Sequence, residues 1–454
     1  MKLSKWYGST LLLAAMLLAP SVYAQKAGGP TTPISPNTLQ ADRYFQDICF
    51  SASASSSSSS IPNLGVSERR QVQAATPQGQ SALRNACGAY LQAPTAAVQK
   101  FIEGINPTGF ISFKIDSLLF AQSENDSAMD RAQALRRMGT SGANAYNISG
   151  VALGGGASAD DSGSLTGKKL GLWFRLNSSS GTKDQTLLTD KLDSSQFGGN
   201  VGMDYRVGDN AVIGGILGYR HSSAKFGDGG VAGKLDASTL NLSGYFSSYL
   251  YKSLYLDSVI NYGKVSYDTR RNVADLSVPP TVYSPDGSTD GNTLTGSVAL
   301  GYEFAANGWT ITPSVHYMYI DSKIDAFAES GTGPFDLSFD KQHYTSSSAR
   351  LDLNVSYAVN SESAVWLPHV RVEAIREFGA NIDTFDVRFV NDLGITPAPL
   401  TVQTDQLDDQ YFRVSAGVSA QFRNDVSAYL DYQQLLSFDA VSLRSVVAGL
   451  RLQF

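Results

Sequence analysis

The feature that most constrains this chain is a period-two alternation of apolar and polar residues that recurs from about residue 168 to the last residue. In "KLGLWFRLN", for example, Leu170, Leu172 and Phe174 fall on one face and Arg175 falls on the other. Such alternation is typical of β-strands with one face in an apolar environment. We count about twelve such segments. They begin near residues 168, 195, 211, 235, 254, 292, 308, 344, 364, 409, 426 and 443.

The connections between these segments alternate in length. The tight turns are "RVGDN", "YKS", "AANG", "VNSES" and "RND", and they alternate with mostly longer connections such as residues 271–291, 325–343 and 380–408. Outer-membrane barrels have this asymmetry, with short periplasmic turns, longer external loops and an even number of strands. The pattern therefore predicts an all-β fold, a twelve-stranded antiparallel transmembrane β-barrel over residues 167–454. An even strand number leaves both barrel ends in the periplasm.

Charged residues lie on the polar face of the predicted strands. A soluble β-sandwich also alternates, and there the charges would face water. Charges of both signs suit the ion-paired lumen of a barrel, and aromatic residues near the strand ends suit interfacial girdles. We therefore expect the barrel, and expect the following side chains to face its lumen: Arg175, Asp204, Glu303, Arg350, Asp352, Arg371, Glu373, Arg413, Asp431 and Arg451.

Residues 1–24 have the features of a secretory signal peptide. Two lysines precede the apolar run "LLLAAMLLA", and "SVYA" supplies small residues suited to cleavage. The run is shorter than the roughly 20 residues that span a bilayer. Because a secreted chain meets oxidising conditions, Cys49 and Cys87 are expected to form a disulfide that adds on the order of 3 to 4 kcal/mol. Two free buried thiols are the alternative.

The segment between the signal peptide and the strands has helical periodicity. Residues 25–114 predict a small helical region that contains the disulfide. In "SENDSAMDRAQALRRMG" acids precede Arg131, Arg136 and Arg137, an order that suits the helix dipole and predicts a helix over residues 115–140. A helix this polar needs a wet environment such as a barrel lumen, where it would be a plug. Residues 141–166 are rich in Gly and Ser and predict a linker.

Composition and motifs exclude several functional classes. A formal charge of -6 gives no basic surface for a nucleic acid. Two cysteines and four scattered histidines offer no ligand set, so we expect neither a metal nor another cofactor. Neither an HExxH zinc motif nor a G-x-S-x-G elbow occurs in the sequence. We therefore expect no enzyme activity.

Several segments together resemble the β-domain of autotransporters (type V secretion). They are "LYLDSVINYGKVSYDTRR", "GYEFAANGWTITPSVHYMYIDSKIDAFAESG", "LPHVRVEAIREFG", "DQYFRVSAGVSAQF" and "VVAGLRLQF", and the resemblance covers about residues 165–454. It implies a barrel that is delivered by periplasmic chaperones and inserted by the barrel assembly machinery. That machinery reads a final strand ending in an aromatic residue, which here is Phe454 preceded by Leu452 and Leu450. It also implies a helix that crosses the pore, whose arginines we expect to pair with carboxylates such as Glu303 or Asp352.

These observations lead to one functional prediction and one alternative. We predict a monomeric translocator barrel in the bacterial outer membrane, in contact with its lipid, that carries a short N-terminal passenger. The passenger is expected to be surface-exposed or adhesive, with the external loops of the barrel as the adhesive part. The sequence departs from the family in two respects. Only about 115 residues, without a repeat, precede the end of the helix, and the linker between the helix and the first strand is long, at roughly 30 residues. The alternative is therefore a channel or structural barrel that exports nothing and keeps a periplasmic N-terminal domain.

Overall fold

The protein is described here by a computed structural model. It describes residues 35–54, 76–137, 147–148, 151–152, 170–208, 210–227, 233–331, 333–378, 384–391, 399–405, 408–422, 426–438 and 441–453. The predicted signal peptide lies outside these residues, as does most of the predicted linker.

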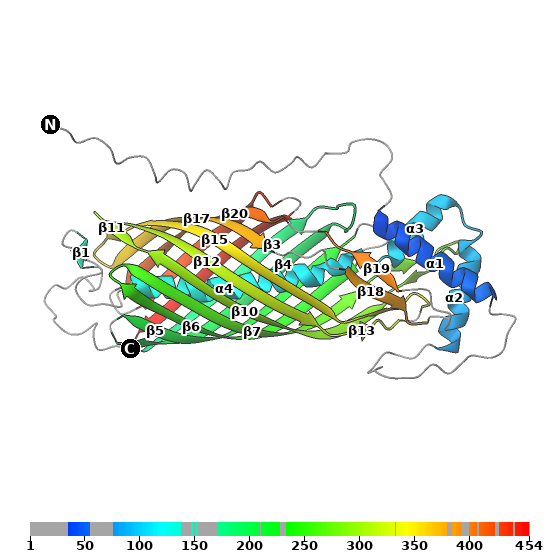
Figure 1. Ribbon diagram of the computed structural model, residues 1–454, viewed down its shortest axis with the longest axis horizontal. Coiled ribbons are helices and arrows are strands. Elements are labelled where there is room, and N and C mark those ends of the chain that lie inside the picture. Colours follow the sequence, from blue (N-terminus) through cyan, green and yellow to red (C-terminus); the bar gives the residue numbers. More distant parts are fainter. Residues whose placement is uncertain are drawn as a thin grey trace, which may run out of the picture. The chain divides into compact units, whose positions relative to one another are not determined.

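Twelve long antiparallel strands form one closed barrel (Figure 1). The first strand pairs with the last, and β10 pairs with β12 to complete the ring. This confirms the predicted fold class, and the strands begin within a few residues of the expected positions. The barrel strands are β3 (Leu170–Lys183), β4 (Leu192–Val207), β5 (Ala211–Phe226), β6 (Gly233–Tyr251), β7 (Leu254–Arg270), β10 (Asp286–Tyr302), β12 (Trp309–Ile324), β15 (Gln342–Tyr357), β17 (Ala364–Phe378), β20 (Gln410–Phe422), β21 (Val426–Leu436) and β22 (Val441–Gln453).

The two ends of the barrel differ in their connections. At the end where β3 begins and β22 finishes, the strands are joined by short turns, and we call this the short-turn end. Asn307 and Gly308 both have positive φ (51° and 85°) in the turn before β12, a conformation that Asn and Gly tolerate best. At the opposite, long-loop end, the connections contain further strands: β8 (Val273–Ala274), β9 (Val282–Tyr283), β13 (Phe327–Ala328), β14 (Leu337–Phe339), β18 (Thr384–Phe389) and β19 (Leu400–Gln403). The remaining short strands are β1 (Asn147–Ile148), β2 (Val151–Ala152), β11 (Phe304–Ala306) and β16 (Val359–Asn360).

The outer and inner faces of the barrel have opposite chemistry. Outward-facing positions carry large exposed apolar side chains, among them Leu217, Ile260 and Leu450 at 56%, 62% and 55% exposure. Inward-facing positions are mostly polar or charged, with aromatic residues and a few aliphatic ones such as Ile216 and Val259. Some inner rings lie flat over a glycine of the next strand, and a Cβ at Gly202 would meet the Trp173 ring at 2.2 Å. The protein therefore turns an apolar face to its surroundings and a polar face to its lumen, as membrane barrels do.

Four α-helices and one short 3-10 helix precede the barrel in the described part of the chain. They are α1 (Pro36–Ala54), α2 (Pro77–Tyr90), α3 (Thr95–Ile105), η2 (Thr108–Phe110) and α4 (Ile111–Arg137). A Cys49–Cys87 disulfide joins α1 to α2, which confirms the predicted pairing. We call α1, α2 and α3 the helical unit. No helix among the described residues combines the length and apolar character needed to span a bilayer.

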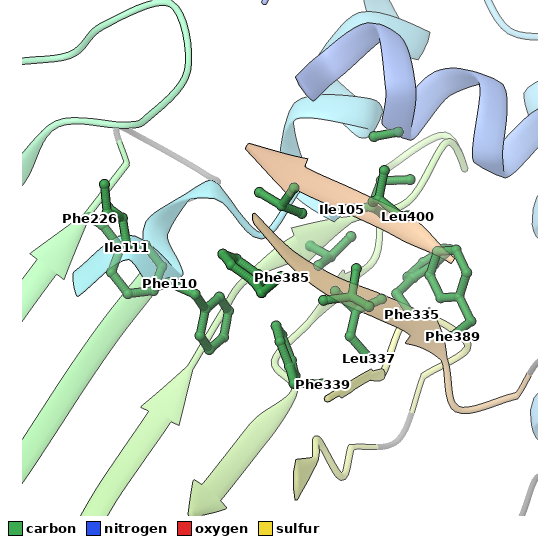
Figure 2. Close-up of a cluster of buried hydrophobic side chains, with 14 of the residues drawn as sticks. Ile105, Phe110, Ile111, Phe226, Phe335, Leu337, Phe339, Phe385, Phe389 and Leu400 are labelled. Carbon is green, nitrogen blue, oxygen red and sulfur yellow. The ribbon is translucent and has the colours of Figure 1, made fainter. Parts of the chain in front are cut away.

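Helix α4 runs inside the barrel, and the helical unit lies at the long-loop end (Figure 1). The helix begins at Ile111, four residues before the predicted start, because Phe110, Ile111 and Phe113 are buried in the apolar core of that end and extend it. Figure 2 shows this core, where aromatic residues of β14 and β18 meet Ile105 and Phe110. The four-stranded sheet β13-β14-β18-β19 forms one side of it.

Candidate functional site

The middle of α4 is held by a cluster of four buried charges. Asp126 accepts hydrogen bonds from Arg350 on β15, at 2.8 Å, and from Arg413 on β20. Both arginines also pair with Glu373 on β17, which lies 2.7 Å from Arg350. Buried charges are tolerated when each is paired and hydrogen-bonded, and here two carboxylates face two guanidinium groups. The cluster fixes the helix to three strands that follow one another around the barrel.

One turn further along, Asp130 links strands that do not touch each other. It accepts hydrogen bonds from Arg371 on β17 at 2.6 Å and from Arg175 on β3 at 3.1 Å. Arg371 also lies 3.5 Å from Asp352. Because β3 and β17 are separated by three strands in the barrel, this carboxylate braces the lumen across its width.

Near the short-turn end the helix contributes a cation instead. Arg131 donates to Asp204 on β4, with Nε at 2.9 Å, and lies 5.6 Å from the centre of the Trp173 ring. Arg451 on the last strand lies 3.7 Å from the same carboxylate. The sequence led us to expect Glu303 or Asp352 as the partner of a helix arginine, and for Arg131 the structure shows Asp204 instead.

The remaining predicted lumen positions lie as follows. Glu303 lies half-buried at the short-turn rim, where Tyr249 donates a hydrogen bond to it at 2.7 Å. Asp431 lies 2.5 Å from His369 on a neighbouring part of the inner wall. The backbone of α4 extends to Arg137, but the side chains of Arg136 and Arg137 lie outside the described residues.

Sequence reasoning missed the acidic residues that carry most of the helix's ionic contacts. Asp116 accepts hydrogen bonds from Arg220 at 3.2 Å and from Ser222 at 2.6 Å, both on β5. Asp126 and Asp130 are four residues apart, so they share one face of α4, and this face points toward the strands that carry the arginines. This spacing of two acids, together with the inward-facing arginines of the predicted strands, could have predicted the ion pairs from the sequence. The expected assignment of charges is therefore largely reversed, since acids on the helix meet arginines on the barrel.

The described part of α4 occupies the lumen and leaves little space beside it. A cavity of about 50 Å³ remains between α4 and strands β17 to β22, lined by residues such as Ser415 and Tyr429. This volume holds one or two water molecules. Among the described residues, no group of three or more His, Cys, Asp or Glu side chains could hold a metal ion. The described part of the lumen thus holds a polar helix through ion pairs and hydrogen bonds.

The long-loop end holds the helical unit through apolar and polar contacts. Tyr44 of α1 stacks on Phe389 of β18 with the ring centres 5.8 Å apart, and Phe101 of α3 meets Phe335 edge-on at 5.2 Å. Asn37 donates to the backbone carbonyls of Leu188 and Gln403, at 2.8 and 2.7 Å. Several long connections of the barrel thus take part in the contact.

A buried ion pair lies beneath these contacts. Arg271 donates to both oxygens of Glu329 at 2.6 Å, and the glutamate has no exposed surface. The same guanidinium donates to the carbonyl of Gly104 in α3 at 3.2 Å. One side chain therefore ties two long connections to the helical unit.

The terminal strand presents the expected apolar face. Leu450 and Leu452 point outward with 55% and 52% of their surface exposed. Arg451 faces inward and is buried. Phe454 lies outside the described residues, so its predicted role as part of an assembly signal stays a prediction.

Comparisons with known proteins agree on the nature of the barrel. A family profile described as the autotransporter beta-domain matches residues 172–433. Outer membrane protein A of Rickettsia conorii is 23% identical over 262 residues, which are 56% of this chain and 13% of that protein. Outer membrane protein B of Rickettsia prowazekii is 22% identical over 392 residues, 81% of this chain and 23% of that protein. The chain thus spans less than a quarter of the length of these relatives.

Among solved structures, the translocator domain of the autotransporter NalP from Neisseria meningitidis is similar to this chain, with a TM-score of 0.49 and 17% sequence identity. The match covers 73% of this chain and 98% of that one. The family profile covers more than half of the chain and nearly the whole barrel. The chain belongs to the autotransporter β-domain family, and its barrel is an outer-membrane translocator domain.

Proposed function

We propose that this translocator barrel has carried its own helical unit to the cell surface and keeps it there as a folded cap on the long loops. The observation that supports this most directly is the direction of α4. The helix begins among the long loops, beside the helical unit, and ends near Asp204 at the short-turn end. The chain before the barrel thus passes through the lumen once, from the long-loop end to the short-turn end.

The orientation of the barrel in the membrane determines on which side the helical unit lies. Short turns face the periplasm and longer loops face outward in outer-membrane barrels. The helical unit, which contacts the long loops, is then on the outer side, and the first barrel strand begins on the periplasmic side. The alternative of a non-exporting barrel with a periplasmic N-terminal domain would require α1 to α3 at the opposite end.

The contacts of the helical unit favour a cap that stays attached. Stacked aromatic rings, the Asn37 hydrogen bonds and the Arg271–Glu329 pair join it to several loops. A passenger that is released into the medium would leave these apolar rings in water. We propose that the unit closes the outer mouth of the lumen, that the loops around it are the adhesive part, and that the chain has a transport and display role without catalysis.

The remaining expectations about biogenesis belong to the same proposal. Residues 1–24 act as the signal peptide, residues 141–166 act as the linker on the periplasmic side, and the barrel works as a monomer. Periplasmic chaperones and the barrel assembly machinery receive the chain, and the machinery recognises Phe454 with Leu450 and Leu452. Deleting Phe454 should lower the amount of assembled barrel in cells, while any barrel that does assemble should keep its thermal stability. Normal assembly of that variant would contradict the signal role.

Exposure of the helical unit on intact cells tests the proposal. An epitope inserted in the turn between α2 and α3, beside the 63% exposed Leu91, should be bound by antibody on intact cells. The same epitope in the short turn at Lys252 and Ser253 is the matched control, and it should become accessible only after the outer membrane is permeabilised. Heat-modifiable migration on a gel checks that both variants contain a folded barrel. If the first epitope is accessible only after permeabilisation, the proposed export is wrong.

A further inference from the structure

The outward face of the barrel changes character along each strand. Starting from the short-turn end it is apolar, and then it becomes polar well before the strand finishes. On β22, Leu452, Leu450 and Val446 are exposed apolar residues, and Arg444 is the next outward residue with a polar side chain. On other strands, polar outward positions beyond this apolar band include Ser178, Ser195, His221, Ser238, Lys264 and Asn292, while Ser248 and Ser258 interrupt the band closer to the short-turn end. The polar residues beyond the band mark the level at which the outer lipid leaflet gives way to its headgroups.

A groove of about 410 Å³ opens at this level where the last strand meets the first. Its polar walls come from serines with exposed or half-exposed side chains and from Arg444, while Phe197 and Val446 form its apolar side. The lining residues are Ser178, Ser179, Ser180, Ser195, Gln196, Phe197, His221, Ser223, Arg444, Ser445 and Val446. No aspartate or glutamate is among them. The groove therefore offers one cation and several hydroxyl groups beside an apolar surface.

Among the described residues, Arg444 lacks the carboxylate partner that several cations on the outer face of the barrel have. Lys234 lies 2.6 Å from Asp236, and Lys323 lies 3.3 Å from Asp321, so these ammonium groups are neutralised locally. Within the described part of the chain, no carboxylate lies within salt-bridge distance of Arg444. A guanidinium that lacks a carboxylate partner at headgroup level, in a groove without acidic residues, is complementary to an anion.

We propose that this groove binds the phosphorylated sugar headgroup of an outer-leaflet glycolipid, the class to which lipid A belongs. The guanidinium of Arg444 would pair with a phosphate through two parallel hydrogen bonds, a geometry that arginine provides and lysine does not. The serine hydroxyls would hydrogen-bond the sugar. Phe197 and Val446 would contact the first carbons of the acyl chains, since both belong to the apolar band directly below. The bound lipid would lie across the junction of β22 and β3, where the barrel is closed.

Native mass spectrometry of the full chain, released from detergent after incubation with defined lipids, tests this proposal. The probes are diphosphoryl lipid A, the same lipid with its phosphates removed, phosphatidylglycerol, and inorganic phosphate. We expect diphosphoryl lipid A to bind and Arg444→Gln to weaken it about tenfold, as loss of a charge-assisted pair does. Lys264→Gln is the matched control, because it removes an exposed cation of the same polar level outside the groove, and it should leave binding unchanged.

The other outcomes overturn the proposal. Equal binding by wild type and Arg444→Gln, with both running as folded barrels on an unheated gel, would show that the groove does not bind the lipid. Equal binding of the dephosphorylated lipid would show that a phosphate is not recognised. Equal binding of phosphatidylglycerol would reduce the effect to general attraction of anionic lipid, and binding of inorganic phosphate with the same dependence on Arg444 would identify a free-anion site instead.

Discussion

The chain before the barrel is held in two places, and the two places use opposite chemistry. Inside the lumen, α4 is held by ion pairs and amide or hydroxyl contacts, such as Asp126 with Arg350 and Asn200 with Ser127. At the long-loop end, the helical unit is held mainly by stacked and edge-on aromatic rings over the buried Arg271–Glu329 ion pair. Both sets of contacts join the same N-terminal segment to the same barrel.

The difference follows from what each part must do during passage. Polar side chains in a wet lumen exchange water for protein partners at little net gain, about 1 kcal/mol per hydrogen bond, so a moving chain is not trapped early. Apolar faces gain far more, roughly 2 kcal/mol for each large side chain removed from water, but only once a helix has folded to present them. The lumen is therefore suited to hold a chain at the end of its passage, and the outer contact is suited to keep it there.

The largest effect should come from breaking the ion pair at the long-loop end. Arg271→Met leaves Glu329 fully buried without its cation, which typically costs about 3 to 5 kcal/mol. The bond from the guanidinium to Gly104 of α3 is lost as well. We expect the helical unit to become sensitive to protease on intact cells while the barrel stays folded, as judged by heat-modifiable migration.

Arg270→Met is the matched control for that variant. Arg270 is the preceding residue, it is exposed, and it pairs with exposed Asp286 at 2.5 Å. It should leave protease sensitivity unchanged because solvent screens such a pair. Equal sensitivity of the two variants would mean that the buried pair does not hold the helical unit.

Removing the disulfide should have the next largest effect and should act on the helical unit alone. Cys49 and Cys87 are 38 positions apart, and opening a loop of this size costs about 3 to 4 kcal/mol through the unfolded state. The double Cys→Ser variant should show faster hydrogen exchange in α1 and α2, and reducing agent should produce the same change in the wild type. Unchanged exchange in α1 and α2 would show that the barrel loops alone order the unit.

The lumen contacts should respond more weakly and locally. Asp126→Asn keeps the shape of the side chain but removes its charge, while Arg350 and Arg413 retain Glu373 as a partner. We expect a loss of about 2 kcal/mol, seen as faster hydrogen exchange in α4 with no change in α1 to α3. The control Asp193→Asn, on an exposed pair 3.5 Å from Lys191, should change neither. Faster exchange in the helical unit of Asp126→Asn would show that the two regions are coupled.

The sequence predicted the barrel better than the contacts within it. Alternation with a period of two and the unequal connections depend on local geometry, so the strands from β3 to β22 could be found without a structure. Partner choice depends on strand stagger, which determines which side chains lie at the same height in the lumen. Arg131 therefore could not be assigned to Asp204. The core at the long-loop end was also missed, because Phe335, Phe385 and Phe389 occur in long connections, where an alternating segment such as Thr384–Phe389 is only six residues long.

The smallest expected effect concerns Asp336, a buried acid at the long-loop end. Burial, followed by the nearby Glu329 carboxylate, raises its pKa from the usual 3.8 to about 6. Between those two pH values the folded state holds a proton that the unfolded state has released, so stability falls as pH rises through this window and stays lower above it.

This dependence can be removed without disturbing the ion pair beside it. Asp336→Asn keeps an oxygen that can accept from the Gly331 amide, which lies 2.9 Å from the carboxylate. Hydrogen exchange of residues 325–341, compared at pH 5 and pH 7.5 after correction for the intrinsic rates, should be slower at pH 5 in the wild type. In Asp336→Asn the corrected rates should match at the two pH values, and at pH 7.5 they should be slower than in the wild type. Faster exchange in the variant at pH 7.5 would mean that the ionised carboxylate stabilises this end. The long-loop end would then depend on charged groups, as the lumen does, and not mainly on its aromatic rings.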